Sequence, residues 1–577
     1  VLGAAGAFGA VAIVAFASTR PEIVEHDPWC GADDPVRRAW NPDTRAQLDQ
    51  VFASASLSVR DSWDRHAPRL ESAARAITNI RTQVCSKPDE QQRACLRRRV
   101  AALEATVAAL RSADDAALVD VAMLVASVPT GPCSDDVVGE SIDARTDEVV
   151  AAIERARLFG LAAQMEGARE AVNEALALAT ELDDRALLSE ALLVYGEYLV
   201  AVGESDRGAA TLRDAAWLAE AARNDGIAAD AWGDLAFHEA YVRHDIEAAR
   251  ANARLAEATC ERIGCSGARL SRLWNTLGVI DRAAGNLDAA IDRYQHSLAA
   301  ATEVSPDASR DVITALGNLA VAYTSAGREA EALPLFERAL AAQADLLRPD
   351  HPEIAIMLGN TAGTLRALGR DADALELDRR SLGILERAYG RENGDVAKAR
   401  INLAMSLRRA GALDEALAQV QQALPVFERL LGTEHPEVAY AHTFLAMVLD
   451  DRHDEAGAIP QYERGVEIAV AVGDAVQEYT ARARFGLMLF RRRELERAHE
   501  QLSRAMQAHE RGHLRLYPLT VRVLDALANI EIGVGQLDDA RARIALADTV
   551  PLDVEIDAEV MREHAAVRER LAATRPP

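Results

Sequence analysis

The chain has 577 residues, with 64 Lys or Arg against 90 Asp or Glu, so its formal net charge is −26. This balance disfavours nucleic acid and anionic membrane surfaces as main partners, because both require a basic footprint. Hydrophobic residues make up 49% and aromatic residues only 5%, which is typical of a long all-α protein and excludes a β-sandwich or a disordered chain.

The first segment, residues 1–18, is apolar and carries no charge. A helix of this length extends about 27 Å, close to the ~30 Å hydrocarbon core of a bilayer. We interpret it as a transmembrane helix. The alternative is the core of a signal peptide, because Ala15-Phe16-Ala17 resembles an A-x-A cleavage site. The acidic flank that follows favours the outside of the membrane for the rest of the chain.

Residues 19–140 predict a small helical domain, since apolar residues recur at helical spacing along 61–84 and along the segment from Pro88 to Leu110. Asn41-Pro42-Asp43-Thr44 is a helix start, with Asp or Thr as the cap. Four helices of this kind would make a compact bundle.

Four of the six cysteines lie in this domain and suggest how its ends are held. We predict a Cys85–Cys95 disulfide, which joins the end of one helix to the start of the next, and a Cys30–Cys133 disulfide, which clamps both ends of the domain. The alternative is a cytosolic protein with six buried free thiols. None of the cysteines has the spacing of metal ligands, so we expect no metal site among them.

Residues 1–145 also contain a set of short motifs that are informative together. They are Cys30 soon after the apolar segment, Asp61-Ser62-Trp63, Thr82-Gln83-Val84-Cys85, Ala94-Cys95-Leu96-Arg97-Arg98-Arg99, and Val128-Pro129 with Cys133. As a set they resemble the extracytoplasmic region of myxobacterial-type transmembrane serine/threonine protein kinases that carry C-terminal tetratricopeptide repeats. The resemblance implies a bacterial inner-membrane location, residues 19–577 outside the cytoplasm, and a kinase domain upstream of Val1.

Residues 141–552 contain ten units of similar sequence. A small residue recurs at Ala168, Gly208, Ala248, Ala290, Ala332, Ala374, Ala416, Ala458, Ala498 and Ala540. A second close-packing position follows seven residues later and is Leu255 in the third unit. Small residues let two helices approach, and a glycine five residues before the first position supplies the turn in six units. Trp274-Asn275-Thr276-Leu277-Gly278 with Tyr294 is a nearly full tetratricopeptide signature. We therefore predict an α-α superhelical solenoid of about ten tetratricopeptide repeats.

The 42-residue length of the central units resembles the kinesin-light-chain type of repeat. Asn318, Asn360 and Asn402 recur at this interval, and connectors such as Glu434-His435-Pro436-Glu437 separate the units. Residues 553–577 predict a C-terminal capping helix with charged residues facing water.

We identify no catalytic motif in the sequence. His509-Glu510-Arg511-Gly512-His513 fits the zinc pattern H-E-x-x-H, with Glu531 as a conceivable third ligand. Gly512 should end the helix and turn His513 away from the shared face, so we interpret the match as chance. His351 and His435 lie in connectors and are interpreted as capping or turn residues. We expect no metal, no cofactor and no enzymatic activity in this chain.

The resemblance to kinesin-light-chain repeats implies that Asn318, Asn360 and Asn402 point into the concave face. Their amides could pair with an extended peptide backbone. Positions four before and six after these residues add Lys398, Arg366 and Arg408, which could seat an acidic side chain or a terminal carboxylate. The alternative is that the Asn side chains bond neighbouring helices and the cations pair with Glu.

These observations lead to one functional interpretation with two alternatives. We interpret the chain as a non-catalytic scaffold that binds a protein or peptide in its groove, and as the extracytoplasmic sensor part of a transmembrane kinase anchored through residues 1–18. The alternatives are a stand-alone periplasmic adaptor and a cytosolic adaptor. A homodimer is compatible with all three, and no nucleic-acid partner is expected.

Overall fold

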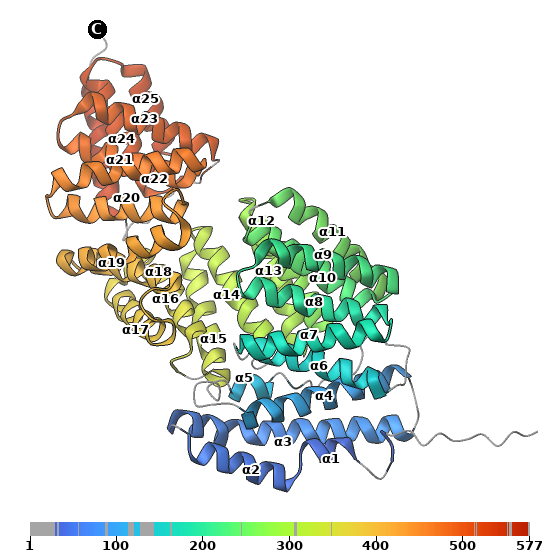
Figure 1. The fold of residues 1–577 in the computed structure, drawn as a ribbon. Helices are drawn as coiled ribbons and strands as arrows, with labels where there is room; N and C mark the ends of the chain where they lie inside the picture. Colours follow the sequence, from blue (N-terminus) through green and yellow to red (C-terminus); the bar gives the residue numbers. More distant parts are fainter. Residues whose placement is uncertain are drawn as a thin grey trace, which may run out of the picture.

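The computed structural model describes residues 29–574 apart from 32–33, 56, 87–89, 113–120, 127, 129–143, 162–163, 244, 305–308, 348, 513, 515, 551 and 553–556. All regular structure in the described part is helical, in agreement with the all-α prediction. Figure 1 shows a bundle at one end, a long array of paired helices, and the C-terminus at the other end. The predicted transmembrane segment 1–18 lies outside the described residues. No helix within the described ranges is long and apolar enough to cross a membrane.

Five helices form the described part of the N-terminal bundle. They are α1 (Pro35–Ala39), α2 (Pro42–Ala53), α3 (Leu57–Ser86), α4 (Glu90–Ser112) and α5 (Val121–Ala126). Trp63 is buried, stacks on Phe52 and donates its indole N–H to Asp49 at 2.7 Å. Asn41, rather than the expected Asp or Thr, caps α2 by accepting the backbone N–H of Thr44 at 2.9 Å.

Both predicted disulfide pairings are wrong in the described part of the bundle. Cys85 bonds to Cys30, with their Cα atoms 5.5 Å apart, and not to Cys95. Arg81 explains the pairing, because its guanidinium donates to the carbonyls of Trp29 and Gly31, each at 2.8 Å, and so holds this loop against the end of α3.

The remaining described cysteines are also oxidised. Cys95 is disulfide-bonded, and its predicted role as the partner of Cys85 does not hold. Cys133 lies outside the described residues. A disulfide joins Cys260 to Cys265 around the left-handed Gly264 at the end of α11. The described part of the chain contains no free cysteine, which contradicts the alternative of six free thiols.

Twenty helices follow as ten antiparallel pairs, each stacked on the next. They are α6 (Ala144–Leu161), α7 (Met165–Glu181), α8 (Arg185–Ala201), α9 (Ser205–Ala222), α10 (Asp225–Tyr241), α11 (Ile246–Ile263), α12 (Gly267–Ala283), α13 (Leu287–Val304), α14 (Arg310–Ser325), α15 (Glu329–Leu346), α16 (Pro352–Ala367), α17 (Asp371–Tyr389), α18 (Gly394–Arg409), α19 (Leu413–Leu431), α20 (Pro436–Asp451), α21 (Glu455–Val472), α22 (Ala475–Arg491), α23 (Leu495–Arg511), α24 (Pro518–Gly533) and α25 (Leu537–Ala547). The predicted solenoid is confirmed, and the even-numbered helices are the first helices of the units.

The register of the third unit differs from the prediction by one residue. The buried alanines of α11 are Ala249, Ala253 and Ala256, whereas Ala248 is half-buried and Leu255 is exposed. This pattern matches the buried set of the neighbouring second helices, so the small residue of this unit is Ala249. The exposed leucine explains why the predicted alignment had a large residue at a close-packing site.

Where the turn residue between paired helices is described, in eight of the ten units, it has left-handed backbone, as predicted for the glycines. Gly327, for example, has φ of 65°, and in the eighth and ninth units His453 and Arg493 adopt φ of 61° and 65°. An added Cβ at Gly327 would meet no atom within 4 Å, so the requirement is conformational and not steric.

We expect Gly327→Ala to lower the free energy of unfolding of its unit by about 1 kcal/mol, because left-handed backbone costs an L-residue energy. Gly363→Ala in α16 is the control: it lies inside a helix, where Ala is favoured, and its Cβ would be 3.6 Å from Arg366. Urea unfolding of both variants measures the difference. Equal effects would contradict the role given to the turn.

A C-terminal helix, α26 (Ala558–Ala573), packs on the last pair and closes the array. His564 on this helix is nearly buried between two carboxylates, with Nδ1 2.7 Å from Asp525 Oδ1 and Nε2 3.1 Å from Asp548 Oδ1. Although burial alone would lower the pKa of His564, the hydrogen bonds to Asp525 and Asp548 raise it above its usual value.

The cap is therefore expected to loosen at alkaline pH. A histidine whose folded pKa is raised stabilises fully below its unfolded pKa of about 6.5, and this stabilisation disappears as pH rises through the folded value. Hydrogen exchange of α26, corrected for intrinsic rates, should show weaker protection at alkaline than at mildly acidic pH. His564→Gln should remove this pH dependence; if the dependence persists, another group is responsible.

Candidate functional site

The first helices of the first four units surround a cavity of about 580 Å³, together with α7 and with α4 from the bundle. Its walls combine apolar side chains, among them Val172, Leu193, Val194 and Ile227, with a dense set of charged ones. The charged residues are Arg98, Glu154, Arg157, Glu190, Glu197, Asp230, Asp234, Arg269 and Arg272. This combination of apolar walls and convergent polar groups is typical of a binding site.

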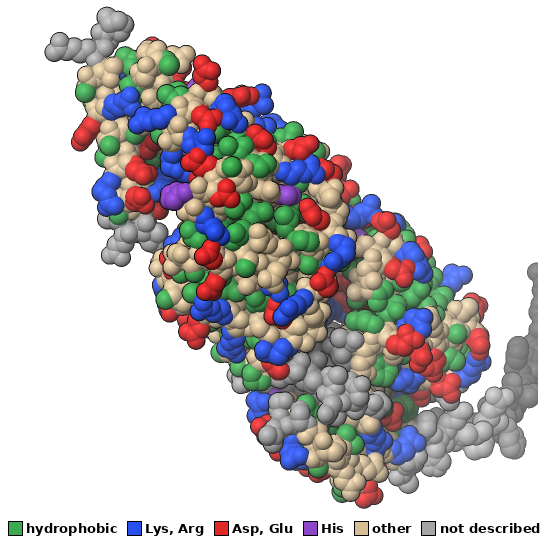
Figure 2. All heavy atoms as spheres, turned by 60° about the vertical axis from the view of Figure 1, so that its left-hand side comes forward, with side chains coloured by type: hydrophobic (Ala, Val, Ile, Leu, Met, Phe, Trp, Pro, Cys, Tyr) green, Lys and Arg blue, Asp and Glu red, His purple; other side chains and the backbone are tan. Residues whose placement is uncertain are grey.

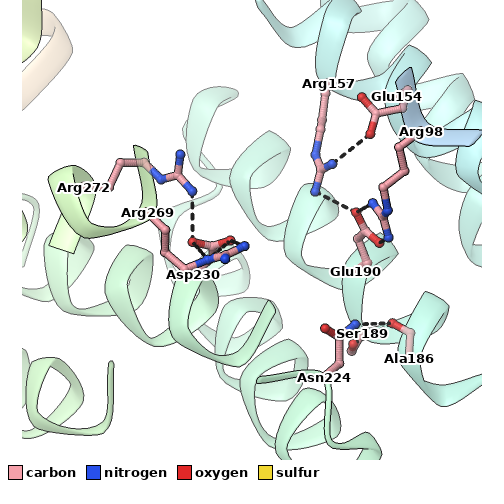
Figure 3. A network of polar contacts seen from close by, with 10 residues as sticks. All are labelled: Arg98, Glu154, Arg157, Ala186, Ser189, Glu190, Asn224, Asp230, Arg269 and Arg272. Carbon is pink, nitrogen blue, oxygen red and sulfur yellow. Dashed lines mark hydrogen bonds and ion pairs between the residues drawn. The ribbon is translucent and has the colours of Figure 1, made fainter. Parts of the chain in front are cut away.

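The first charged network joins the bundle to the solenoid (Figure 3). Arg98 of α4 holds the carboxylate of Glu190 on α8 with two hydrogen bonds of 2.6 Å, and Arg157 of α6 contacts the same carboxylate at 3.0 Å. Arg157 also bonds Glu154 at 3.1 Å. Although burial alone would raise the pKa of Glu190, Arg98 and Arg157 lower it to about 2. Glu190 is therefore ionised at neutral pH.

The second network lies across the cavity on α10 and α12. Asp230 accepts hydrogen bonds from Arg269 at 3.2 Å and from Arg272 at 3.0 Å. Burial would raise the pKa of Asp230, but the two guanidinium groups lower it. All four arginines that line the cavity thus already have carboxylate partners.

Glu197 of α8 and Asp234 of α10 are different, because they line the same cavity without a cation. Neither carboxyl group forms an ion pair with any described side chain, and the two lie close enough to shift each other's pKa. Burial, the neighbouring Glu197 and Asp230 raise the pKa of Asp234 well above its usual value. Burial also raises the pKa of Glu197, although Arg157 acts in the opposite direction.

The residues predicted to form the groove lie further along the array, on α14, α16 and α18. Asn318 donates its amide to Asn275 of the preceding unit at 2.7 Å, and Asn360 is exposed. A Cβ added to Gly359 would lie 3.5 Å from the amide nitrogen of Asn402, so Asn402 packs against the preceding unit.

Each predicted groove cation has a carboxylate partner. Arg366 pairs with the buried Asp378, Arg408 pairs with Asp451, and the exposed Lys398 lies 3.8 Å from Glu437. These pairings agree with the alternative interpretation, in which the cations pair with acidic side chains of the array. Whether this segment binds a ligand stays a prediction.

The cavity was not among the predicted sites, although the repeat register points to it. The position that holds Asn in the central units is Glu154 in the first unit, and the position four residues earlier is Glu190 in the second and Arg272 in the fourth. In the third unit the same two positions are Asp234 and Asp230, so extending the register to the first four units would have found five of the charged residues. The pairing with Arg98 could not be found this way, because α4 belongs to the bundle.

Comparison with known families identifies the central units. The family profile described as Tetratricopeptide repeat matches residues 311–387 and 395–469. These two segments are tetratricopeptide repeats. They cover α14 to α17 and most of α18 to α21, and the kinesin-light-chain type predicted for the tetratricopeptide repeats is supported. No curated protein matches the chain.

Several solved structures are similar in fold to the tetratricopeptide array. A putative kinesin light chain of Podosopora anserina is 22% identical over 35% of this chain and 98% of its own, with a TM-score of 0.31. BtubC (BKLC) from P. vanneervenii is 20% identical over 41% of this chain and 93% of its own, with a TM-score of 0.34. A Rap protein complexed with Competence and Sporulation Factor is 15% identical over 74% of this chain and all of its own, with a TM-score of 0.45.

The described histidines among those considered in the sequence analysis cap helices or pack in the core. His351 and His435 cap α16 and α20, each accepting the backbone N–H two residues later at 3.2 Å, which confirms their interpretation. His509 is buried with its ring edge-on to Tyr479, Glu531 pairs with Arg543, and His513 lies outside the described residues. Among the residues that the structure describes, no group of His, Cys, Asp and Glu could hold a metal ion.

Proposed function

We propose that the chain is a non-catalytic scaffold that captures a peptide or protein segment, and that the cavity between α4 and α12 receives one of its side chains. The observation that carries the proposal is a volume of about 580 Å³ with apolar walls and two carboxyl groups that have no cation. A site of this size fits a single large side chain or a short peptide segment.

A substitution that fills the cavity tests the proposal. Gly160 on α6 lines the cavity, and a Cβ added there would meet no atom within 4 Å, so Gly160→Phe projects a ring into free space. Gly233→Phe on α10 is the matched control, because its Cβ also meets open space but it does not line the cavity. Peptides selected from a random display library on the unmodified chain should lose binding to Gly160→Phe and keep binding to Gly233→Phe. Equal binding to both variants would contradict the proposal.

We further propose that the chain is the extracytoplasmic sensor part of a bacterial transmembrane serine/threonine kinase, anchored through residues 1–18. The motif resemblance of residues 1–145 supports this assignment. The Cys30–Cys85 and Cys260–Cys265 disulfides support an oxidising compartment, since cytosolic thiols are kept reduced.

Three measurements separate this location from the alternatives. Thiol alkylation in intact cells should find the cysteines unreactive until a reductant is added, whereas a cytosolic adaptor would react directly. Retention in membranes after an alkaline wash distinguishes an anchored chain from a released periplasmic adaptor. A reading frame that encodes a kinase domain upstream of Val1 would supply the proposed parent, and a nearby start codon would contradict it.

A further inference from the structure

We propose that the cavity selects a basic side chain, the ammonium group of lysine or the guanidinium group of arginine, and seats it against Glu197 and Asp234. The inference rests on the proposed function and deepens it, because it specifies the chemistry of the captured segment. It follows from which charges in the cavity are already paired and which are not.

The ion pairs in the cavity do not include the carboxyl groups of Glu197 and Asp234. Arg98 and Arg157 are both engaged by Glu190, and Arg157 also by Glu154. On the opposite wall, Arg269 and Arg272 converge on Asp230. No lining arginine remains to pair with Glu197 or Asp234.

The charge count of the cavity points to a cation. Four arginines and five carboxyl groups line it, so one negative charge is in excess when all are ionised. Two carboxylates that line one cavity repel each other, and this repulsion favours the protonated form of Asp234, whose pKa is raised. A ligand that brings one positive charge can replace that proton and balance the count.

The neighbouring walls suit the rest of a basic side chain. Leu193, Val194 and Ile227 line the cavity beside the carboxyl groups and can cover an aliphatic stem. Figure 3 shows Arg157 and Arg272 apart from each other in two separate ion-pair networks, and each would repel a cation placed beside it. The cationic seat is thereby restricted to the space in front of Glu197 and Asp234.

Binding should release a proton, which gives the proposal a second readout. The groups that face the pair are Arg98 on α4, Glu154 and Arg157 on α6, Glu190 and Tyr198 on α8, Asp230 on α10, Arg269 and Arg272 on α12, and Asp311 beside Arg272 on α14. Glu190 and Asp230 are held ionised by their arginines, so the proton leaves from the Glu197–Asp234 pair. Affinity for a cation should therefore rise with pH.

The test uses blocked pentapeptides Ala-Ala-X-Ala-Ala, with X as Lys, Arg, Gln or Glu, and calorimetry on the full chain. The Lys and Arg peptides should bind at least about tenfold more tightly than the Gln peptide, and the Glu peptide should bind most weakly. Their affinity should rise between about pH 5 and about pH 8, with a binding heat that depends on the ionisation enthalpy of the buffer. Butylamine serves as the probe for a free amine without a peptide backbone. If butylamine binds as tightly as the Lys peptide, the cavity does not recognise a peptide, and the proposal that it seats a side chain of a captured segment is overturned.

Two variants assign the effect to the pair. Glu197→Gln and Asp234→Asn should each lower the affinity for the Lys peptide by about tenfold or more and reduce the proton release on binding. Asp214→Asn on α9 is the matched control, because it removes the same charge from an exposed residue that does not line the cavity. Glu197 is exposed within the cavity, so its replacement leaves the fold intact even if Asp234→Asn does not.

The outcome distinguishes this inference from the proposed function. If Gly160→Phe abolishes peptide capture but Lys and Gln peptides bind equally, or Glu197→Gln has no effect, the scaffold stands and the cationic seat is wrong. Preferred binding of the Glu peptide would also overturn the inference. If no display-selected peptide depends on Gly160, the proposed function itself fails.

Discussion

Glu190→Gln is expected to destabilise the junction between the bundle and the solenoid by about 3–5 kcal/mol. The side chain of Glu190 is 1% exposed, and it neutralises Arg98 from the bundle and Arg157 from the first unit. The substitution leaves Arg98 and Arg157, which are largely buried, with Glu154 as the remaining carboxylate in ion-pair contact. Loss of one partner of a buried ion network is costly because the remaining charge cannot return to water.

Hydrogen exchange resolves this effect along the array, since each unit contacts only its neighbours. Protection of α4, α6 and α8 should fall, while protection of α22 to α25 should not change. Glu174→Gln is the control: Glu174 pairs with Arg155 at 2.7 Å but is about half exposed, so its loss should cost less than about 1 kcal/mol. A uniform loss of protection would mean that the variant acts on the whole chain.

The same network predicts sensitivity to acid. Glu190 has a folded pKa of about 2, below its unfolded value of about 4.3. Its stabilisation is therefore present above the unfolded pKa and is lost as pH falls through the folded one. Glu190→Gln should remove this part of the acid dependence at α4 and α8.

The repeat architecture could be predicted because it depends on local spacing. Small residues such as Ala290 and Ala332 are fully buried where two helices touch, so their recurrence in the sequence reports the packing directly. The third unit was misaligned by one residue because Ala248 and Ala249 are adjacent alanines, and only burial distinguishes them.

The disulfides and the cavity could not be predicted, since both depend on contacts between distant segments. Cys30 meets Cys85 only because Arg81 holds the chain near Trp29 against α3. Glu190 is 92 residues from Arg98 in sequence, and no periodicity links the two. A groove inferred from repeat register alone also misses ion pairs within the array, such as that of Arg366, which the sequence analysis placed in the groove.

Asp378→Ala is the second variant for which we expect a large effect, about 3–5 kcal/mol at the sixth and seventh units. Asp378 on α17 is fully buried, accepts the hydroxyl of Ser406 on α18 at 2.6 Å, and pairs with Arg366 on α16, whose side chain is 10% exposed. Arg366 also donates to Ser406 at 3.0 Å, so one guanidinium connects three helices. Asp373→Ala removes an exposed partner of Arg370 on the same helix and should cost less than about 1 kcal/mol.

A double variant decides whether Arg366 is structural or a groove residue. If the cost of Asp378→Ala comes from an uncompensated buried charge, adding Arg366→Met should recover much of it, because an apolar side chain of similar size needs no partner. The coupling is measured by hydrogen exchange of α16 to α18 in the two single variants and the double variant. If Arg366 instead anchors a ligand, Arg366→Met alone will reduce peptide binding with little loss of protection, and the two substitutions will be additive. We expect strong coupling, because the hydrogen bonds of Arg366 to Asp378 and Ser406 direct its guanidinium into the contact between units.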